Sequence, residues 1–217
     1  MKSVETARRG NGRADGRSAA DFLPESRSLR GLREAARTCR GCELYKRATQ
    51  TVFGAGPSLA SVMLVGEVPG DQEDLQGKPF VGPAGRLLDE SLTAAGLTRK
   101  QVYLTNAVKH FKWEPRGKRR LHAKPSAREI SACRPWLEAE IEALHPRTIV
   151  CLGATAAQAL MGRTFRLTRH LGEVLSSPWS QRLVATYHPS AILRAPEPED
   201  RQRMKREFIE HLQLAAL

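Results

Sequence analysis

VYLTNAVKHFKWEPRGKRRLH, residues 102–122, joins a predicted β-strand to a strongly basic loop. Its first seven residues are mostly apolar and predict the strand, with the amide of Asn106 near the carboxyl end. Seven lysines and arginines and one acid lie between Lys109 and Lys124. A positive loop tipped by His122 suits a phosphate backbone with a reactive group beside it, and the alternative is a solvated basic turn.

Strands and helices alternate along the chain. Three further apolar runs predict strands at residues 61–66, 148–153 and 182–188. Periodic or capped segments predict helices at 28–38, 84–96, 126–144, 154–161 and 198–214, and glycines and prolines predict a long turn at 67–83. Pro135 is expected to kink its helix or to mark the helix start. The alternation indicates an α/β domain whose central sheet has four parallel strands.

The composition favours a polyanionic partner. The 217 residues include 35 lysines and arginines against 23 acids, a formal net charge of +12. Nucleic acid is the commonest such partner; a membrane surface is the alternative, although no apolar segment is long enough to span one. Residues 1–27 are expected to be a disordered basic tail before one domain at 28–217. We expect a cytoplasmic location, because the start lacks a secretory signal, and a monomer, because no exposed apolar helix face is evident.

The cysteines suggest half of a metal or cluster site. Cys39 and Cys42 are separated by two residues, a spacing common in such sites. A redox pair is the rival interpretation, but no βαβ pattern precedes these cysteines. Cys151 lies within an apolar strand and is expected to be a core residue. Disulfides are not expected in a reducing compartment.

Polar residues follow three different predicted strands. Glu67, Asn106 and His188 each stand near a strand's carboxyl end, and Asp71 leaves the same edge as Glu67. Ligands of parallel sheets bind in the crevice at this edge, so the sequence predicts a binding site there. Phe80, in a glycine-rich loop, is either an aromatic of this site or a plug in the core. The alternative for His188 is that it only caps the end of its strand and has no role in binding.

Five motifs resemble a known family. GEVPG (66–70), KPFVGPAG (78–85), TNAVK (105–109) and HPS (188–190) are similar to motifs of the uracil-DNA glycosylase superfamily, and more narrowly of its iron–sulfur branch. Within that branch, KRRLH (118–122) resembles the UdgX type, glycosylases that become trapped covalently on the DNA they attack. The resemblance covers about residues 35–215 and implies a three-layer αβα fold with activity on uracil-containing DNA, single strands being the expected form and free uracil the product.

The resemblance also implies a role for each matching residue. Phe80 would stack on the extruded base and Asn106 would pair with the uracil edge, with Gly66 and Val68 completing the uracil-binding set. His188 would stabilise the departing base. Glu67 would activate His122, the nucleophile, and Asp71 belongs to the same catalytic set. Lys118, Arg119, Arg120 and Ser190 would contact DNA, and the three cations are expected to keep His122 neutral.

The implied cofactor is a 4Fe–4S cluster held by Cys39, Cys42, His110 and Cys133, and zinc would accept the same ligands. His110 stands where hydrolytic relatives have a cysteine. Val68 stands where UdgX-type proteins usually have glutamine, and it cannot supply that amide's hydrogen bonds. Two alternatives to covalent capture through His122 remain: a hydrolytic glycosylase that turns over, and a catalytically silent DNA-binding module.

Overall fold

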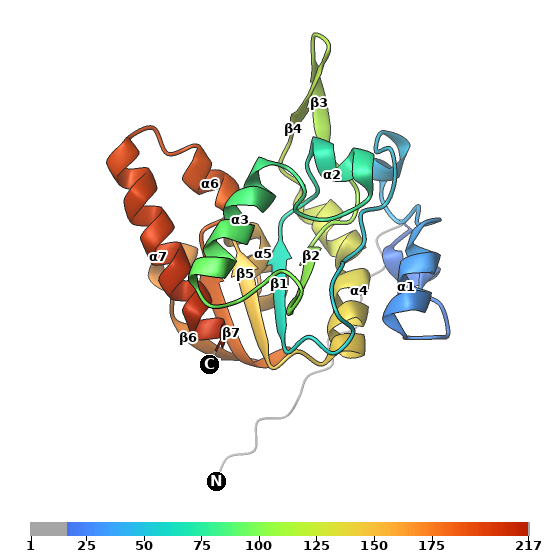
Figure 1. The fold of residues 1–217 in the computed structure, drawn as a ribbon. Helices are drawn as coiled ribbons and strands as arrows, with labels where there is room; N and C mark the ends of the chain where they lie inside the picture. The colour runs from blue at the N-terminus through green and yellow to red at the C-terminus, as the bar shows by residue number, and fades with distance from the viewer. Residues whose placement is uncertain (1–16, 217) are drawn as a thin grey trace.

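A mostly parallel sheet forms the centre of the computed structural model, which describes residues 17–216 (Figure 1). Within those residues the sheet has five strands in the order β2-β1-β5-β7-β6. The parallel strands are β1 (Val62–Gly66), β2 (Val102–Asn106), β5 (Thr148–Leu152) and β7 (Ser180–Thr186), and β6 (Val174–Ser177) pairs antiparallel with β7. The four expected parallel strands are therefore present.

The fifth strand, β6, corrects the expected four-stranded sheet. It forms a hairpin with β7 at the sheet edge. Its residues are alternately exposed and half-buried, and Val174 is 43% exposed. A strand that is not buried on both faces carries no continuous apolar run, so the pattern of residues did not predict it.

Helices cover both faces of the sheet (Figure 1). One face packs on α4 and α5, and the other packs on α3, α6 and α7. The α-helices are α1 (Leu29–Ala36), α2 (Asp71–Gln76), α3 (Pro83–Ala94), α4 (Ala127–Leu144), α5 (Ala154–Met161), α6 (Pro189–Leu193) and α7 (Pro198–Ala216). Short 3-10 helices are η1 (Ala19–Phe22), η2 (Glu43–Lys46) and η3 (Leu167–Arg169).

The central strands are apolar on both faces because each face meets a helical layer. In β1, Met63 and Val65 pack with α4 and α5, whereas Val62 and Leu64 pack with α3 and α7. Side chains alternate between faces along a strand, so a strand between two layers reads as a continuous apolar run. Burying each such side chain contributes about 1.5–3 kcal/mol. This three-layer arrangement brings the carboxyl ends of the parallel strands to one edge.

Helix α2 lies in the segment expected to be a turn. Glu73 occupies the third helical position and accepts a hydrogen bond from the N–H of Gly70, and Gly77 ends the helix with φ 68°. A helix of six residues is too short to display a helical period, which is why the sequence pattern indicated only a turn. The glycines and prolines that follow it do form a loop before α3.

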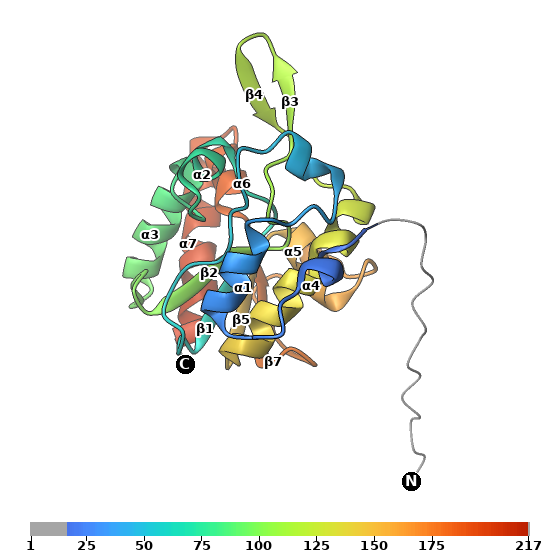
Figure 2. The same cartoon turned by 90° about the vertical axis from the view of Figure 1, so that its right-hand side faces the viewer.

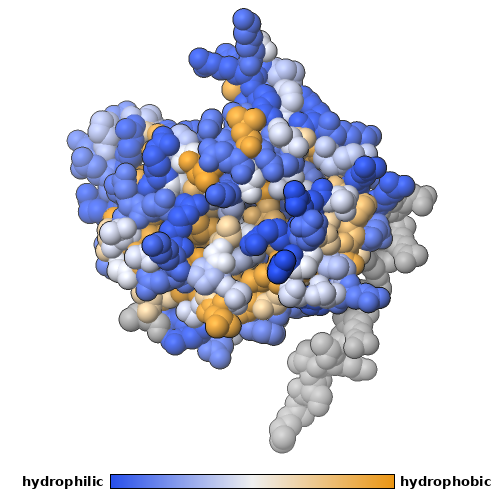
Figure 3. Space-filling model, turned by 45° about the vertical axis from the view of Figure 1, so that its right-hand side comes forward, coloured by the Kyte–Doolittle hydropathy of each residue, from blue (hydrophilic) through white to orange (hydrophobic). Residues whose placement is uncertain are grey.

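The basic segment after β2 is a projecting β-hairpin where a loop was expected. Strands β3 (Trp113–Arg116) and β4 (Arg119–His122) are antiparallel, with Trp113 opposite His122 and Gly117 at the turn with φ 59°. The hairpin rises away from the sheet (Figures 1 and 2), and its surface is largely hydrophilic (Figure 3). Both faces of the hairpin are mostly polar, so no alternation of apolar and polar residues predicts these strands.

Part of the expected disordered tail is ordered. The 3-10 helix η1 lies beside α4 (Figure 2) and packs against it. It is capped by Ser18, and Ala19 is fully buried. The loop between Cys39 and Cys42 packs closely against η1, since a Cβ on Gly41 would lie 2.6 Å from the nitrogen of Ala19. Ala19 is the one small buried residue that supplies this contact. A single alanine in a polar sequence is too weak a pattern to predict an ordered helix. Residues 1–16, the rest of that predicted tail, lie outside the described residues.

The long helices frame the sheet. Helix α4 continues through Pro135, so this proline does not mark the helix start. Helix α7 buries Phe208 and Leu212 against the sheet and turns charged residues outward. Among residues 17–216, none of the helices has the length and apolar character needed to cross a bilayer.

Candidate active site

A cavity of about 370 Å³ opens at the carboxyl edge of the sheet. It brings together side chains from β2, the loop before α3, the hairpin and α6. Its lining includes these residues predicted for the site: Val68, Asp71, Phe80, Asn106, His122, His188 and Ser190. The prediction that the strand ends converge on one site is consistent with this geometry.

Asn106 forms one wall of the cavity. It is the last residue of β2, stands opposite Gly66 in the sheet and is only 3% exposed. A Cβ on Gly66 would lie 2.3 Å from Asn106 Oδ1 and 2.6 Å from Phe80 Cζ. The absence of a side chain at Gly66 therefore allows the amide and the aromatic ring to approach each other.

Phe80 lines the cavity near Asn106 and is held by a constrained loop. Its φ is 54°, a left-handed conformation that a bulky residue rarely adopts. Arg99 donates a hydrogen bond to its carbonyl at 2.8 Å, and a Cβ on Gly85 would lie 1.9 Å from the same oxygen. The Phe80 ring lies 6.1 Å from the His188 ring at 31°. The ring is well buried yet lines the cavity, so it is more than a plug in the core.

Glu73 organises this loop, and sequence reasoning missed it. Its carboxylate accepts hydrogen bonds from the N–H groups of Val81 and Gly82, both at 2.8 Å, and of Gly70 at 3.1 Å. The signal available was its place three residues after a glycine that starts a helix, a capping position. Glu73 thus fixes the backbone on both sides of the cavity mouth.

Replacing Glu73 with alanine is expected to destabilise the protein by about 3 kcal/mol, because several partly buried N–H groups lose their acceptor. For a protein of this size, that change lowers Tm by roughly 6–12 °C. Thermal unfolding followed by circular dichroism measures it. Glu90→Ala is the control, since Glu90 makes an exposed ion pair with Lys205, and a similar loss in both variants contradicts this role of Glu73.

His188 has a defined tautomer. It precedes α6, and its Nδ1 accepts hydrogen bonds from the Ser190 N–H at 3.1 Å and faces the Ser190 hydroxyl at 2.7 Å. Because a backbone N–H can only donate, Nδ1 is unprotonated and the ring proton resides on Nε2. Burial, with smaller effects of His122 and Arg194, lowers the pKa of His188 to about 4. The ring is therefore a neutral donor, oriented by a residue that was predicted to contact DNA.

His122 stands at the end of β4, on the rim of the cavity. Its ring lies 6.2 Å from the Phe111 ring, and one part of the side chain faces solvent. Burial of the remainder lowers its pKa, Glu67 opposes this shift, and Arg194 reinforces it. The cation that favours the neutral ring is therefore Arg194 of the α6 end, in place of the expected Lys118, Arg119 and Arg120.

Arg120 connects the hairpin to α2. Its Nε donates to Asp71 at 2.7 Å and its Nη1 to Asp74 at 2.7 Å. Asp74 is fully buried and also accepts from the N–H of Thr49 at 2.9 Å. The predicted DNA contact Arg120 and the predicted catalytic residue Asp71 thus engage each other. By contrast, Lys118 and Arg119 are exposed at the hairpin end.

Three of the predicted cluster ligands share one apolar region between α1 and α4, which also contains Trp136. Cys39 Sγ accepts from Trp136 Nε1, and Cys133 Sγ accepts from the N–H of Lys109, both at 3.2 Å. Burial raises the pKa of Cys133 to about 12, so a thiolate here requires a compensating positive charge such as a metal centre.

His110 is also buried, and its Nε2 lies 3.2 Å from the hydroxyl of Thr51. In the described part of the chain, no group of three or more His, Cys, Asp or Glu is arranged to hold a metal ion. Each ligand of a four-iron cluster binds a different iron, so those ligands are spaced more widely than ligands of one ion. The three cysteines, with N–H donors at two of the sulfurs, fit the chemistry of such a cluster.

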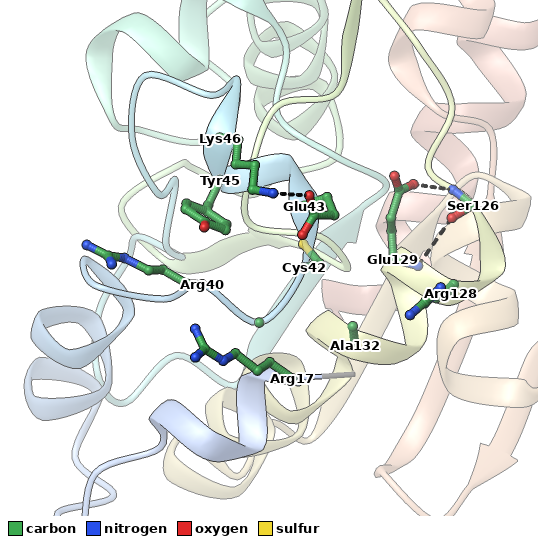
Figure 4. A pocket seen from close by; sticks show the side chains of 11 residues that line it. Arg17, Arg40, Cys42, Glu43, Tyr45, Lys46, Ser126, Arg128, Glu129 and Ala132 are labelled. Carbon is green, nitrogen blue, oxygen red and sulfur yellow. Dashed lines mark hydrogen bonds and ion pairs between the residues drawn. The ribbon is translucent and has the colours of Figure 1, made fainter. Parts of the chain in front are cut away.

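A second pocket, of about 620 Å³, lies beside Cys42 (Figure 4). Arg17 and Arg40 extend on one side of it, and Arg128 and Glu129 of the α4 start lie on the other. The carboxylate of Glu129 accepts hydrogen bonds from the N–H of Ser126 at 2.6 Å and from the ammonium of Lys112 at 2.9 Å. Of the predicted site residues that the structure describes, Cys42 is the one that lines this pocket, so the reactive groups are gathered in the first.

Comparison with known proteins agrees with this fold. The profile described as the uracil DNA glycosylase superfamily matches residues 53–213. The chain belongs to the uracil-DNA glycosylase superfamily.

Among its relatives are enzymes named type-4 uracil-DNA glycosylase. That of Pyrobaculum aerophilum is 39% identical over 175 residues, which cover 77% of this chain and 86% of the relative. That of Archaeoglobus fulgidus is 39% identical over 167 residues, 74% of this chain and 80% of the relative. A type-5 uracil-DNA glycosylase of Pyrobaculum aerophilum is 34% identical over 151 residues, 61% of this chain and 62% of the relative.

Proposed function

We propose that the protein excises uracil from DNA and is then captured covalently on the resulting abasic C1′ through His122. The observation that carries the proposal is the position of a neutral His122 on the same cavity as Asn106, Phe80 and His188. A nucleophile beside the pocket that takes the base can reach the sugar carbon exposed when the base leaves.

Base recognition would fall to Asn106 and Phe80. A base inside a duplex must be extruded, or the strand must be single, before its edge can be read. The Asn106 amide donates and accepts, which matches the imino N–H and carbonyl of uracil and leaves cytosine mismatched. Stacking on Phe80 contributes about 1–3 kcal/mol. Val68 adds an apolar wall and no hydrogen bond, so uracil recognition depends chiefly on Asn106.

His188 would stabilise the leaving base. When the C1′–N1 bond breaks, its electron pair stays on uracil, whose oxygen then carries negative charge. The Nε2–H of His188 can donate to that charge, because Ser190 holds the other ring nitrogen. A neutral donor needs no proton uptake before the reaction, which agrees with the low pKa of His188.

His122 would then capture the sugar. The lone pair of one imidazole nitrogen forms a bond to C1′, and the proton on the other ring nitrogen passes to Glu67, whose charge acts on this ring. The uracil anion takes its proton from solvent after release. The new C1′–N bond lacks an activated leaving group, so each protein molecule acts once. Asp71 contributes through Arg120, which fixes β4 against α2.

The hairpin and a cluster would complete the active protein. Lys118 and Arg119 lie exposed at the hairpin end and suit the phosphates of a single strand. Cys39, Cys42, His110 and Cys133 would hold a 4Fe–4S cluster, which supplies a cross-link between the cysteine loop, the start of the hairpin segment and α4. Its role in this proposal is structural.

The second candidate is hydrolytic excision with turnover, in which water captures C1′ and His122 assists. The relatives named type-4 uracil-DNA glycosylase favour it. Its product accumulates beyond one equivalent of protein, whereas covalent capture stops at one.

Excision is tested by mixing the protein with a labelled single strand that contains one uracil and measuring free uracil. Release from this strand, and none from a strand with cytosine or thymine at the same position, is the expected result. Equal binding of all three strands without any base release would indicate the silent DNA-binding module and contradict the proposal.

Capture is expected to persist below pH 6.5, the ordinary histidine value. Burial lowers the pKa of His122, so its ring keeps the lone pair at a pH where an exposed histidine is protonated. Capture fails only at still lower pH, where the imidazolium is not nucleophilic. The initial rate of adduct formation against pH measures this, and a midpoint at or above 6.5 contradicts the lowered pKa.

A further inference from the structure

A lysine and a glutamate are paired out of contact with solvent directly beneath the cavity wall. Lys109 Nζ lies 2.5 Å from Glu140 Oε2, and both side chains are 0% exposed. Lys109 belongs by sequence to the basic segment after β2, yet it turns into the protein, and Glu140 comes from the carboxyl-terminal half of α4. The pair is therefore unavailable to a phosphate backbone.

Each polar atom of this pair has a partner. The Lys109 ammonium donates to the hydroxyl of Thr105 and the carbonyl of Asn106, both at 2.7 Å, as well as to Glu140. The Glu140 carboxylate also accepts from the Tyr103 hydroxyl at 2.9 Å and the Gly54 N–H at 3.0 Å. Such complete pairing is what allows two charges to remain inside a protein.

Stability alone does not explain the pair. Desolvating two ions costs several kcal/mol each, and well-packed apolar residues are often as stable in their place. What the ammonium adds is a fixed hydrogen bond to the Asn106 carbonyl, at the strand end where the cavity amide is attached. The same lysine donates its backbone N–H to Cys133, so one residue ties the cavity wall to the cysteine region.

We propose that the buried Lys109–Glu140 pair is a positioning device that holds Asn106 in register with uracil. The inference rests on the proposed function and deepens it. Neither residue touches the base; Lys109 fixes the Asn106 backbone and Glu140 fixes Lys109. A shift of about 1 Å in the amide reduces the rate up to ~100-fold while leaving the rest of the cavity intact.

The test replaces the pair with neutral residues of similar size, Lys109→Met together with Glu140→Gln, which keeps an acceptor for Gly54 and Tyr103. The rate of uracil release is measured at saturating protein, and the protein concentration that gives half of the maximal rate is measured separately. We expect the maximal rate to fall about 10- to 100-fold, with half-saturation unchanged because the hairpin cations are untouched. The control is Lys205→Met with Glu90→Gln, an exposed ion pair between α7 and α3, which should match wild type.

The deciding comparison repeats the pair replacement in an Asn106→Ala background. A positioning role predicts no further loss there, because the group being positioned is gone. The same fold-loss in both backgrounds, or no loss in either, overturns the inference. Should the double variant fail to fold, Thr105→Val removes a hydroxyl that bridges Lys109 and Glu140, and its smaller loss must likewise vanish with Asn106→Ala.

The two proposals fail differently. Wild-type protein that releases no uracil contradicts the proposed function and this inference together. Wild-type protein that releases uracil at the same rate as the pair variant contradicts the inference alone.

Discussion

His122→Ala is expected to slow formation of the covalent adduct with uracil-containing DNA at least about 1,000-fold, equivalent to ~4 kcal/mol in the barrier. The imidazole is the group that bonds to C1′, and alanine offers no lone pair. Asn106 and His188 remain in place, so uracil release should continue at a reduced rate, with water capturing the sugar. A denaturing gel run after heating measures the adduct, and alkaline strand cleavage measures the abasic product.

His170→Ala is the matched control, because His170 is a half-buried histidine outside the cavity lining that pairs with Glu173. It should form the adduct at the wild-type rate. An undiminished adduct in His122→Ala would sink the assignment of the nucleophile, and loss in both variants would indicate general damage to the protein.

Gly66→Ala is expected to lower uracil release about 100-fold, equivalent to ~3 kcal/mol in the barrier. The added Cβ would lie 2.3 Å from Asn106 Oδ1 and 2.6 Å from Phe80 Cζ, so the two groups that receive the base must move apart. Because the clash is with side chains on one side of a strand, the sheet should persist and Tm should change by only a few degrees. Single-turnover release at saturating protein measures the effect.

Gly31→Ala is the control for replacing a glycine by alanine. Gly31 lies in α1, where a Cβ meets the serine hydroxyls of Ser26 and Ser28 at 3.1 and 3.2 Å, and alanine suits a helix. Wild-type activity is expected there. Wild-type activity in Gly66→Ala as well would mean that Asn106 and Phe80 do not need their present approach.

The features that sequence predicted share one physical origin. The parallel strands are buried on both faces, so Val62–Gly66 and Thr148–Leu152 appear as unbroken apolar runs. In such a sheet the strand ends meet at one edge, so the sequence alone predicts that Asn106 and His188 lie close together, and both line the cavity. The roles of Phe80 and His122 were implied by the resemblance of KPFVGPAG and KRRLH to motifs of the family.

What sequence did not predict depends on contacts between distant residues. Lys109 and Glu140 are 31 positions apart, and nothing local distinguishes this lysine from its exposed neighbours. Arg194, which helps keep His122 neutral, follows α6 and reaches the hairpin histidine only through the fold. The hairpin strands are polar on both faces and α2 is one short helix, so neither produces a hydrophobic period.

The most direct test of covalent capture is the intact mass of the protein after reaction with a strand containing one uracil, combined with the amount of uracil released. We predict a species whose mass is the protein plus the strand less uracil, with release stopping at one uracil per protein molecule. Release that exceeds one equivalent while the protein keeps its original mass would contradict capture through His122 and establish hydrolysis with turnover.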